Sequence, residues 1–371
     1  MMKLIENQNI NKQFFINNKQ IQIIMKKYLT LAAIAALTLA ACSKVETTSV
    51  NDDELVPIGF GAYAGRSLSK ASSDSYIAEG STFSATNQHI GVYAFSGTST
   101  TADFMNDVDV TLAGNGATAS DNYSPLKYWP KDETVDANKL SFFAYYPYNG
   151  TGISRTNLCT SRYGSIVFTA QAAAADQVDL MVSDAVENQY YSTNSGVVPF
   201  VFHHALTRVL FYFNVDADYH AAGTDIVVTG VTVSNINTVG TLTLASTYAG
   251  SNWGSQGTPE SFSPAYPNTY LTTTAAPTEA AANVFLMVPQ TLSNSAKLTV
   301  TYTTEDLATH VVKNGTAEVQ LNTIEKAAGV AVAEWTKNMN IAYTITLSLK
   351  PIKFTATVNP WESLTSAGVT L

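Results

Sequence analysis

A strict alternation of residue types near the end of the chain constrains the fold most strongly. Between residues 341 and 349 every second residue is large and apolar, and the residues between them are alanine, threonine and serine. A period of two indicates a strand with one buried face. Pro351 ends this run, and a second alternating run begins at Ile352. We therefore expect two neighbouring strands joined by a tight connection.

Similar short segments, separated by Gly, Asn, Asp and Pro, occur along most of the chain. They are residues 89–95, 140–146, 165–169, 199–202, 206–215, 226–233, 240–244, 284–288 and 298–302. No long amphipathic helix competes with them in the sequence. Many short strands at regular spacing predict an all-β fold made of β-sandwiches.

A bacterial lipoprotein export signal begins at Met25. Two lysines follow it, residues 28–39 form an uncharged, mostly apolar run, and two alanines precede Cys42. The run is shorter than the roughly 20 apolar residues that span a bilayer. We therefore expect residues 1–41, an upstream extension plus signal peptide, to be absent from the mature protein, and Cys42 to carry a lipid.

The composition fits an exported β protein. Loss of residues 1–41 removes five lysines and one glutamate, so the formal charge of −9 becomes about −13. This acidic balance argues against nucleic-acid binding. Only Cys159 remains once Cys42 is acylated, so an internal disulfide framework is excluded. The charged fraction of 13% lies below the roughly 25% of ordinary soluble domains.

The chain divides into a tether and two domains. Residues 42–56 are polar and acidic without apolar periodicity and predict a tether between the lipid and the first domain. Residues 57–216 are expected to form an N-terminal β-sandwich and residues 217–371 a C-terminal one, with the boundary after an aromatic strand.

The first domain opens with a short extended segment. Ile58, Phe60 and Ala62 occupy every second position of it and alternate with small residues. Arg66 and Ser67 then begin a serine-rich connection that we expect to be exposed, and exposed basic residues invite proteolysis.

Catalytic and metal-binding patterns are weak in this sequence. The five histidines offer no helix-spaced pair, so no metal site and no cofactor are expected. His203 and His204 are adjacent in a strand-like segment, so one should pack and the other should meet solvent. Ser67 and Lys70 resemble part of the penicillin-binding serine motifs, but an all-β pattern lacks the helix that such a nucleophile needs. We therefore expect no enzyme.

Several pieces, in a fixed order behind the export signal, carry a family resemblance over nearly all of the mature chain. They are HIGVYA at 89–94, YWP at 128–130, LSFFAYYP at 140–147, DLM at 179–181, FHHALTRV at 202–209 and YTITL at 343–347, followed by Trp361. Together they resemble the fimbrillin-like pilins of Bacteroidales, also called type V pilins. The resemblance implies two transthyretin-like β-sandwiches, export as an outer-membrane lipoprotein, and assembly with other subunits into surface fimbriae.

The resemblance also implies a processing route. In that family a trypsin-like protease cuts after an arginine near the start of the first domain and removes the lipidated leader with its first strand. By position Arg66 matches that arginine, so the product would begin at Ser67. The strand that contains Ile58, Phe60 and Ala62 matches the one that leaves. The groove would then accept a donor strand from another subunit.

Two questions stay open at this level. Leu364, Val369 and Leu371 give the C-terminal tail apolar side chains for a donor strand, but the tail could equally be a frayed end. The alternative function is a permanently lipid-anchored adhesin or glycan-binding protein, whose partner would be a host protein or glycan held by exposed aromatic rings. Three tryptophans, however, fit packing better than sugar binding. They are Trp129, Trp335 and Trp361.

Overall fold

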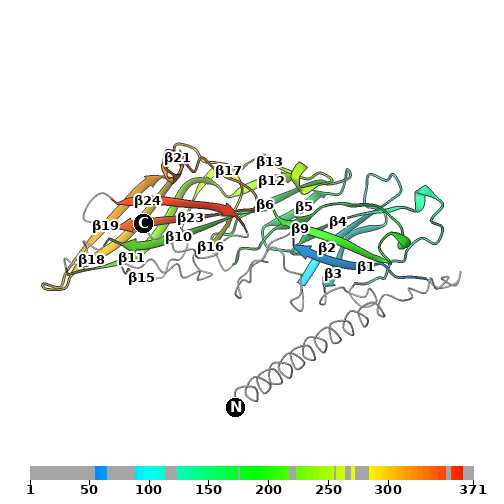
Figure 1. Ribbon diagram of the computed structural model, residues 1–371, viewed down its shortest axis with the longest axis horizontal. Coiled ribbons are helices and arrows are strands. Elements are labelled where there is room, and N and C mark those ends of the chain that lie inside the picture. Colours follow the sequence, from blue (N-terminus) through cyan, green and yellow to red (C-terminus); the bar gives the residue numbers. More distant parts are fainter. Residues whose placement is uncertain are drawn as a thin grey trace, which may run out of the picture. The chain divides into compact units, whose positions relative to one another are not determined.

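The computed structural model describes residues 55–64, 88–112, 123–173, 176–216, 223–254, 256–263, 269–271, 284–347 and 352–361. Within these ranges the regular elements are β-strands and short 3-10 helices, which confirms the predicted all-β fold class (Figure 1). The 3-10 helices are η2 (Asp136–Asn138), η4 (Tyr191–Thr193), η5 (Tyr248–Gly250) and η7 (Leu321–Thr323). None of the helices in the described ranges has the length and apolarity to span a membrane.

The largest sheet comes mostly from the first half of the chain. Its strand order is β1-β9-β7-β4-β2-β3, and β8 also pairs with β4. The strands are β1 (Gly59–Ala64), β2 (Gln88–Ser96), β3 (Met105–Leu112), β4 (Leu140–Tyr146), β7 (Met181–Ser183), β8 (Val186–Gln189) and β9 (Val197–His204). A second sheet has the order β13-β12-β6-β5. Its strands are β5 (Ile153–Leu158), β6 (Gly164–Thr169), β12 (Val239–Thr243) and β13 (Asn252–Gly254).

The remaining sheets come mostly from the second half. One has the order β16-β10-β23-β24-β20-β21, another the order β14-β11-β18-β19 with β15 beside β11, and β17 pairs with β22. The strands are β10 (Thr207–Val215), β11 (Thr224–Asn237), β14 (Pro259–Phe262), β15 (Thr269–Tyr270), β16 (Val284–Met287), β17 (Gln290–Thr291), β18 (Lys297–Asp306), β19 (Val311–Gln320), β20 (Glu325–Ala327), β21 (Val330–Ala331), β22 (Glu334–Trp335), β23 (Met339–Leu347) and β24 (Lys353–Pro360).

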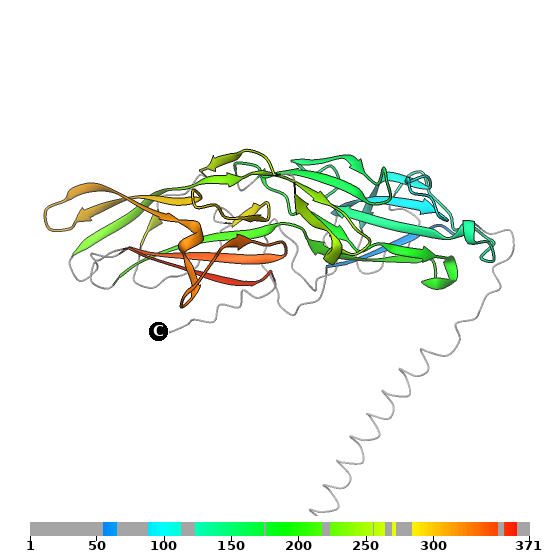
Figure 2. The same cartoon turned by 90° about the horizontal axis from the view of Figure 1, so that it is seen from above.

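The two alternating runs near the C-terminus form neighbouring strands, as predicted. They are β23 and β24, which pair antiparallel with Ile345 opposite Phe354. Tyr343, Ile345 and Leu347 are buried, because the period of two places them all on the inner face. This face packs with apolar residues of β11 and β18, and the two layers are seen side by side in Figure 2.

The largest sheet buries side chains on both faces. Ile90 and Val92 of β2 point into a core that the sheet itself encloses, together with Phe142 of β4. Tyr93 and Phe95 point the other way, into a larger core shared with the other sheets. This double burial explains why residues 140–145 are all buried and read as a continuous apolar run.

Backbone pairing joins the two halves of the chain. β10, which precedes residue 216, pairs in parallel with β23 and antiparallel with β16. β12, which follows residue 216, pairs with β6. Strands on the two sides of residue 216 are thus hydrogen-bonded to each other. The division into domains 57–216 and 217–371 stays a prediction.

Buried tyrosines predict a loss of stability at alkaline pH. Burial raises the pKa of Tyr146 to about 12 and the pKa of Tyr145 still further. In the unfolded chain the tyrosine hydroxyls ionise near the ordinary pKa of 10.0. The folded state holds these protons more tightly, so the tyrosines stabilise it fully below pH 10, and this stabilisation is lost as the pH rises toward 12. We expect the thermal midpoint to fall over this interval as tyrosinate absorbance appears. Tyr146→Phe should reduce the slope and Tyr128→Phe, at an exposed ring, should not. A midpoint independent of pH between 10 and 12 would contradict the prediction.

Candidate functional site

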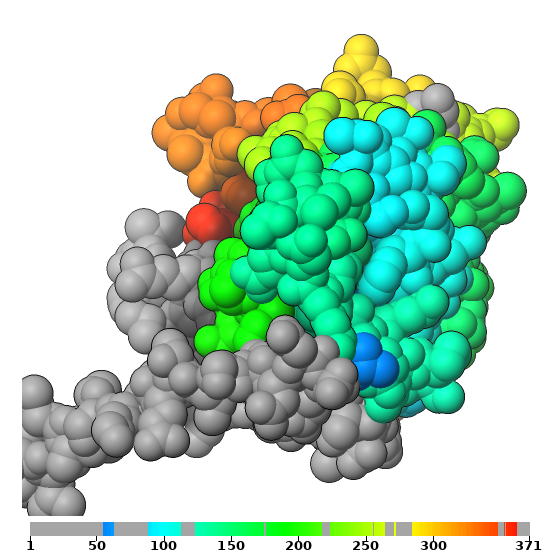
Figure 3. Space-filling view, turned by 90° about the vertical axis from the view of Figure 1, so that its right-hand side faces the viewer, coloured from blue at the N-terminus to red at the C-terminus, as the bar shows by residue number. Residues whose placement is uncertain are grey.

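The candidate site is the edge of the largest sheet, where β1 lies. β1 is the outermost strand and pairs in parallel with β9, from Gly59 opposite Val197 to Ala64 opposite Phe202. The residues just before β1 are also hydrogen-bonded to a second segment, residues 127–129. The Ile58 backbone N–H donates to the Lys127 carbonyl at 2.9 Å, and the Trp129 N–H donates to the Val56 carbonyl at 2.9 Å. In Figure 3 the blue atoms of this part of the chain reach the molecular surface.

Two side chains of β1, and that of Ile58 just before it, belong to the enclosed core although the strand lies at an edge. Ile58 and Phe60 are 0% and 1% exposed, and Ala62 packs against the same core. The Phe60 ring stacks on Phe200 at 5.9 Å between centroids and meets the edge of Tyr123 at 5.4 Å. Phe60 therefore fills a pocket that would be empty without β1. Burying a phenylalanine side chain contributes roughly 1.5–3 kcal/mol to the stability of the fold.

Polar contacts fix the walls of this pocket. The Tyr123 hydroxyl lies 3.1 Å from the carbonyl oxygens of both Ile58 and Lys127 and donates to them, and burial raises the pKa of this hydroxyl. The Trp129 Nε1–H donates to the Gly196 carbonyl at 3.0 Å, and the Gly59 N–H donates to the same oxygen at 2.9 Å. Both contacts to Gly196 keep the start of β9 aligned with β1.

The arrangement is suited to accept or lose a strand. Without β1, the outer edge of β9 would present a row of backbone donors and acceptors. The pocket of Phe60 would open beside this edge. Any replacement strand would have to restore both the backbone hydrogen bonds and the apolar side chains at every second position.

The structure describes some of the predicted site residues and not others. Phe60 and Ala62 lie on β1 and Ile58 directly precedes it, and all three face one core. The remaining predicted residues lie outside the described ranges, namely Cys42, Arg66, Ser67, Leu364, Val369 and Leu371.

The expectation for the two adjacent histidines is confirmed. His204 is fully buried and bonds Asp179, with Nδ1 2.9 Å from Oδ2. His203 is partly exposed, lies 3.0 Å from Asp184 and stacks on Tyr248. Each imidazole thus has a carboxylate partner and packs within the fold.

The four tryptophans differ in burial, and the sequence predicted this for only three of them. Trp129, Trp335 and Trp361 are buried, as expected for packing residues. Trp253 is partly exposed and lines an open pocket. Sequence reasoning missed Trp253 and Tyr123, because each lies beside a short polar segment without periodicity and only the fold gives them neighbours.

Truncation of Phe60 measures how much β1 contributes to stability. Phe60→Ala is expected to lower the free energy of unfolding by about 3–5 kcal/mol, since the pocket against Phe200 is left empty. Phe60→Leu keeps a branched apolar side chain in the pocket and should cost less than Phe60→Ala. Urea denaturation of the unprocessed protein gives both values. Equal midpoints for the wild type and Phe60→Ala would show that β1 does not stabilise this core.

Comparison with known proteins identifies the family of most of the chain, although the match begins after β1. The profile of the fimbrillin-like family matches residues 78–361. Among curated proteins, fimbrium subunit Fim1C of Phocaeicola vulgatus is 29% identical over 199 residues, which are 48% of this chain and 49% of that protein. The chain thus spans about half the length of the curated relative it matches.

Solved structures share the fold at low sequence identity. A candidate cell adhesion protein from Bacteroides uniformis superposes with a TM-score of 0.52 at 19% identity, over 82% of this chain and 98% of that one. A fimbrial protein from Bacteroides vulgatus gives 0.51 at 18% identity, over 82% and 99%. The fold is therefore that of these proteins, and the matched profile covers most of the chain. The chain belongs to the fimbrillin-like family, as its sequence motifs predicted.

Proposed function

We propose that this chain is a structural subunit of a surface fimbrium, assembled by exchange of the strand at the β1 position. One observation carries the proposal. β1 lies at a sheet edge, and yet its Phe60 and the preceding Ile58 are completely buried in the core. Such a strand can leave without breaking the order of the other strands, and its loss creates a specific apolar acceptor groove.

Export and processing would prepare the groove. A lipid on Cys42 attaches the precursor to the outer membrane, and a trypsin-like protease cuts after Arg66. β1 ends at Ala64, two residues earlier, so this cut separates the whole strand and its tether from the rest of the chain. The lipid is then a temporary anchor that is discarded with β1.

The donor strand would come from the C-terminal tail of another subunit. Val369 and Leu371 are two residues apart and share one face of an extended strand, whereas Leu364 lies out of phase with them. These two side chains can therefore occupy neighbouring pockets of the kind that Phe60 fills. Backbone hydrogen bonds to β9 would restore the edge.

A permanently lipid-anchored adhesin is the second candidate function. The partly exposed Trp253 favours it, because a half-exposed aromatic ring is suited to bind a ligand face. The family consists of structural subunits, which points away from enzymatic activity. The first residue of the surface protein separates the two candidates. An acylated Cys42 indicates the permanent anchor, and Ser67 indicates the processed subunit.

The processing site can be tested with one pair of variants. Limited digestion of the purified precursor with a trypsin-like protease that cuts after arginine and not after lysine should give a single product that starts at Ser67, followed by larger assemblies on size-exclusion chromatography. Arg66→Ala should abolish both, whereas Lys70→Ala, at the next basic residue, should change neither. Normal assembly of Arg66→Ala would refute processing at this residue.

Two charge substitutions at neighbouring positions test whether the C-terminal tail is the donor strand. Val369→Asp should prevent assembly of the processed protein, because a carboxylate would enter an apolar pocket. Thr370→Asp places the same charge on the other face and should assemble normally. Electron microscopy of both processed variants gives the readout. Fibres of equal length from Val369→Asp and the wild type would exclude the tail as donor.

A further inference from the structure

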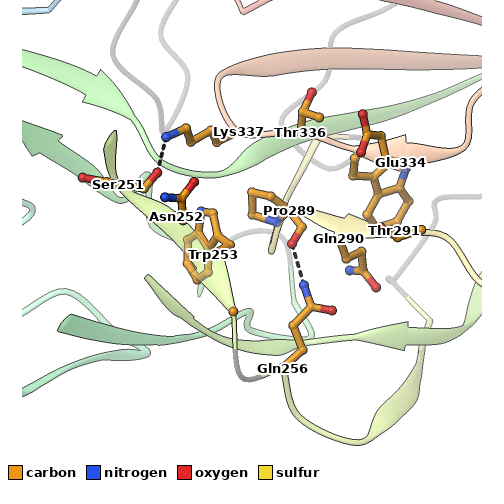
Figure 4. Close-up of a pocket in the computed structure, with 12 residues that line it drawn as sticks. Ser251, Asn252, Trp253, Gln256, Pro289, Gln290, Thr291, Glu334, Thr336 and Lys337 are labelled. Atoms are coloured by element: carbon orange, nitrogen blue, oxygen red, sulfur yellow. Dashed lines mark hydrogen bonds between the residues drawn. The ribbon is translucent and has the colours of Figure 1, made fainter. Parts of the chain in front are cut away.

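An open pocket of about 680 Å³ lies between the edge strand β13 and the short pair β17 and β22. Figure 4 shows Trp253 and Lys337 on one side of it and Glu334 on the other. A volume of this size falls within the range of ligand sites in proteins. The lining combines the partly exposed Trp253 and the buried Trp335 with amides, hydroxyls and two opposite charges.

The indole of Trp253 is held rigidly. Its Nε1–H donates to the Ala205 carbonyl at 2.7 Å. The benzene edge of the indole lies so close to Gly240 that a Cβ there would be 3.1 Å from Cε3. The ring is thus fixed by a hydrogen bond at one edge and by packing at the other, while its side chain remains partly exposed in the pocket.

The amides of the pocket are also fixed in orientation. The Gln256 Nε2 donates to the Pro289 carbonyl at 2.7 Å, and its Oε1 accepts from Asn237 Nδ2 at 2.5 Å. Gln290 is buried and donates from Nε2 to the carbonyls of Asn237 and Val288. These contacts make the wall beside Trp253 a preorganised polar surface.

The two charged residues add hydrogen-bonding groups of opposite kind. The Lys337 Nζ donates to the carbonyls of Tyr248, at 2.8 Å, and Ser251. The same ammonium lies over the Tyr248 ring, 4.2 Å from its centroid, so it is held against the pocket wall. Glu334 is exposed at the other side of the pocket and offers carboxylate acceptors.

This combination fits a sugar ring. The C–H face of a pyranose can lie on an indole, while its hydroxyls donate to a carboxylate and accept from an amide. The polar lining disfavours an apolar ligand. Glu334 and the net charge of −9 disfavour a polyanion. We propose that the Trp253 pocket binds a neutral sugar unit of a surface glycan.

The test uses the full chain in its unassembled form, so its result does not depend on the proposed polymerisation. Saturation-transfer NMR is recorded with the methyl glycosides of galactose, mannose and N-acetylglucosamine as probes, and the dissociation constant is then obtained by titration. At least one probe should bind. Trp253→Ala should weaken binding about tenfold or more, since a ring contact of about 1.4 kcal/mol corresponds to that factor.

Two further variants separate binding from folding. Trp253→Phe keeps an aromatic face without the hydrogen bond to Ala205, so it should retain part of the affinity. Glu334→Ala alters an exposed side chain and should weaken binding while the thermal midpoint is unchanged. Tyr128→Ala removes an exposed ring outside the pocket and should bind like the wild type.

Three results would overturn the proposal. The first is no saturation transfer to any of the three probes at millimolar concentration. The second is unchanged affinity in both Trp253→Ala and Glu334→Ala. The third is a Trp253-dependent response to a synthetic peptide of residues 362–371 without a response to the sugars, which would assign the pocket to pairing of an extended chain with the edge of β13.

Discussion

The packing of Phe60 against Phe200 is the contact on which the proposed role depends. It joins an edge strand to an aromatic core that also contains Tyr123 and Phe142. An edge strand with a polar inner face would leave the sheet at little cost and would leave no specific groove. A central strand could not leave without breaking the sheet. β1 combines an edge position with a fully buried Phe60, which is the condition proposed here for a strand that can be replaced.

The connection between β9 and β10 links the sheet that contains β1 to the sheets of the second half of the chain. β9 pairs with β1, and the chain then continues through Ala205 and Leu206 into β10, which pairs with β23. Groups from later in the chain bond this connection. The Trp253 Nε1–H donates to the Ala205 carbonyl, and the Asn338 N–H donates to the Leu206 carbonyl at 2.9 Å. His204, just before it, stacks on Trp361.

The proposed groove and the proposed sugar pocket lie on different sheets. β1 belongs to the largest sheet, whereas Trp253 lies on β13 at the edge of another. Exchange of a strand at β1 therefore removes no residue of the pocket. A subunit of this design could be polymerised and still present a binding surface, so the structural and adhesive functions need not exclude one another.

Local pattern determined a large part of this protein. The period of two in residues 341–358 gave β23 and β24 with the correct inner face, because alternation depends only on the geometry of one strand. The adjacent positions of His203 and His204 gave one buried and one partly exposed imidazole for the same reason. Motif order was enough to identify the fimbrillin-like family.

Pairing between distant segments was decided only by the tertiary structure. The sequence placed the aromatic strand 206–215 in the first domain, but its hydrogen bonds run to β16 and β23, more than sixty residues away. Nothing local to Tyr123 or Trp253 indicated that one closes over β1 and the other lines a pocket. Alternation fixes which face of a strand is buried, whereas its partner is chosen by the packing of the whole core, which no short window of sequence contains.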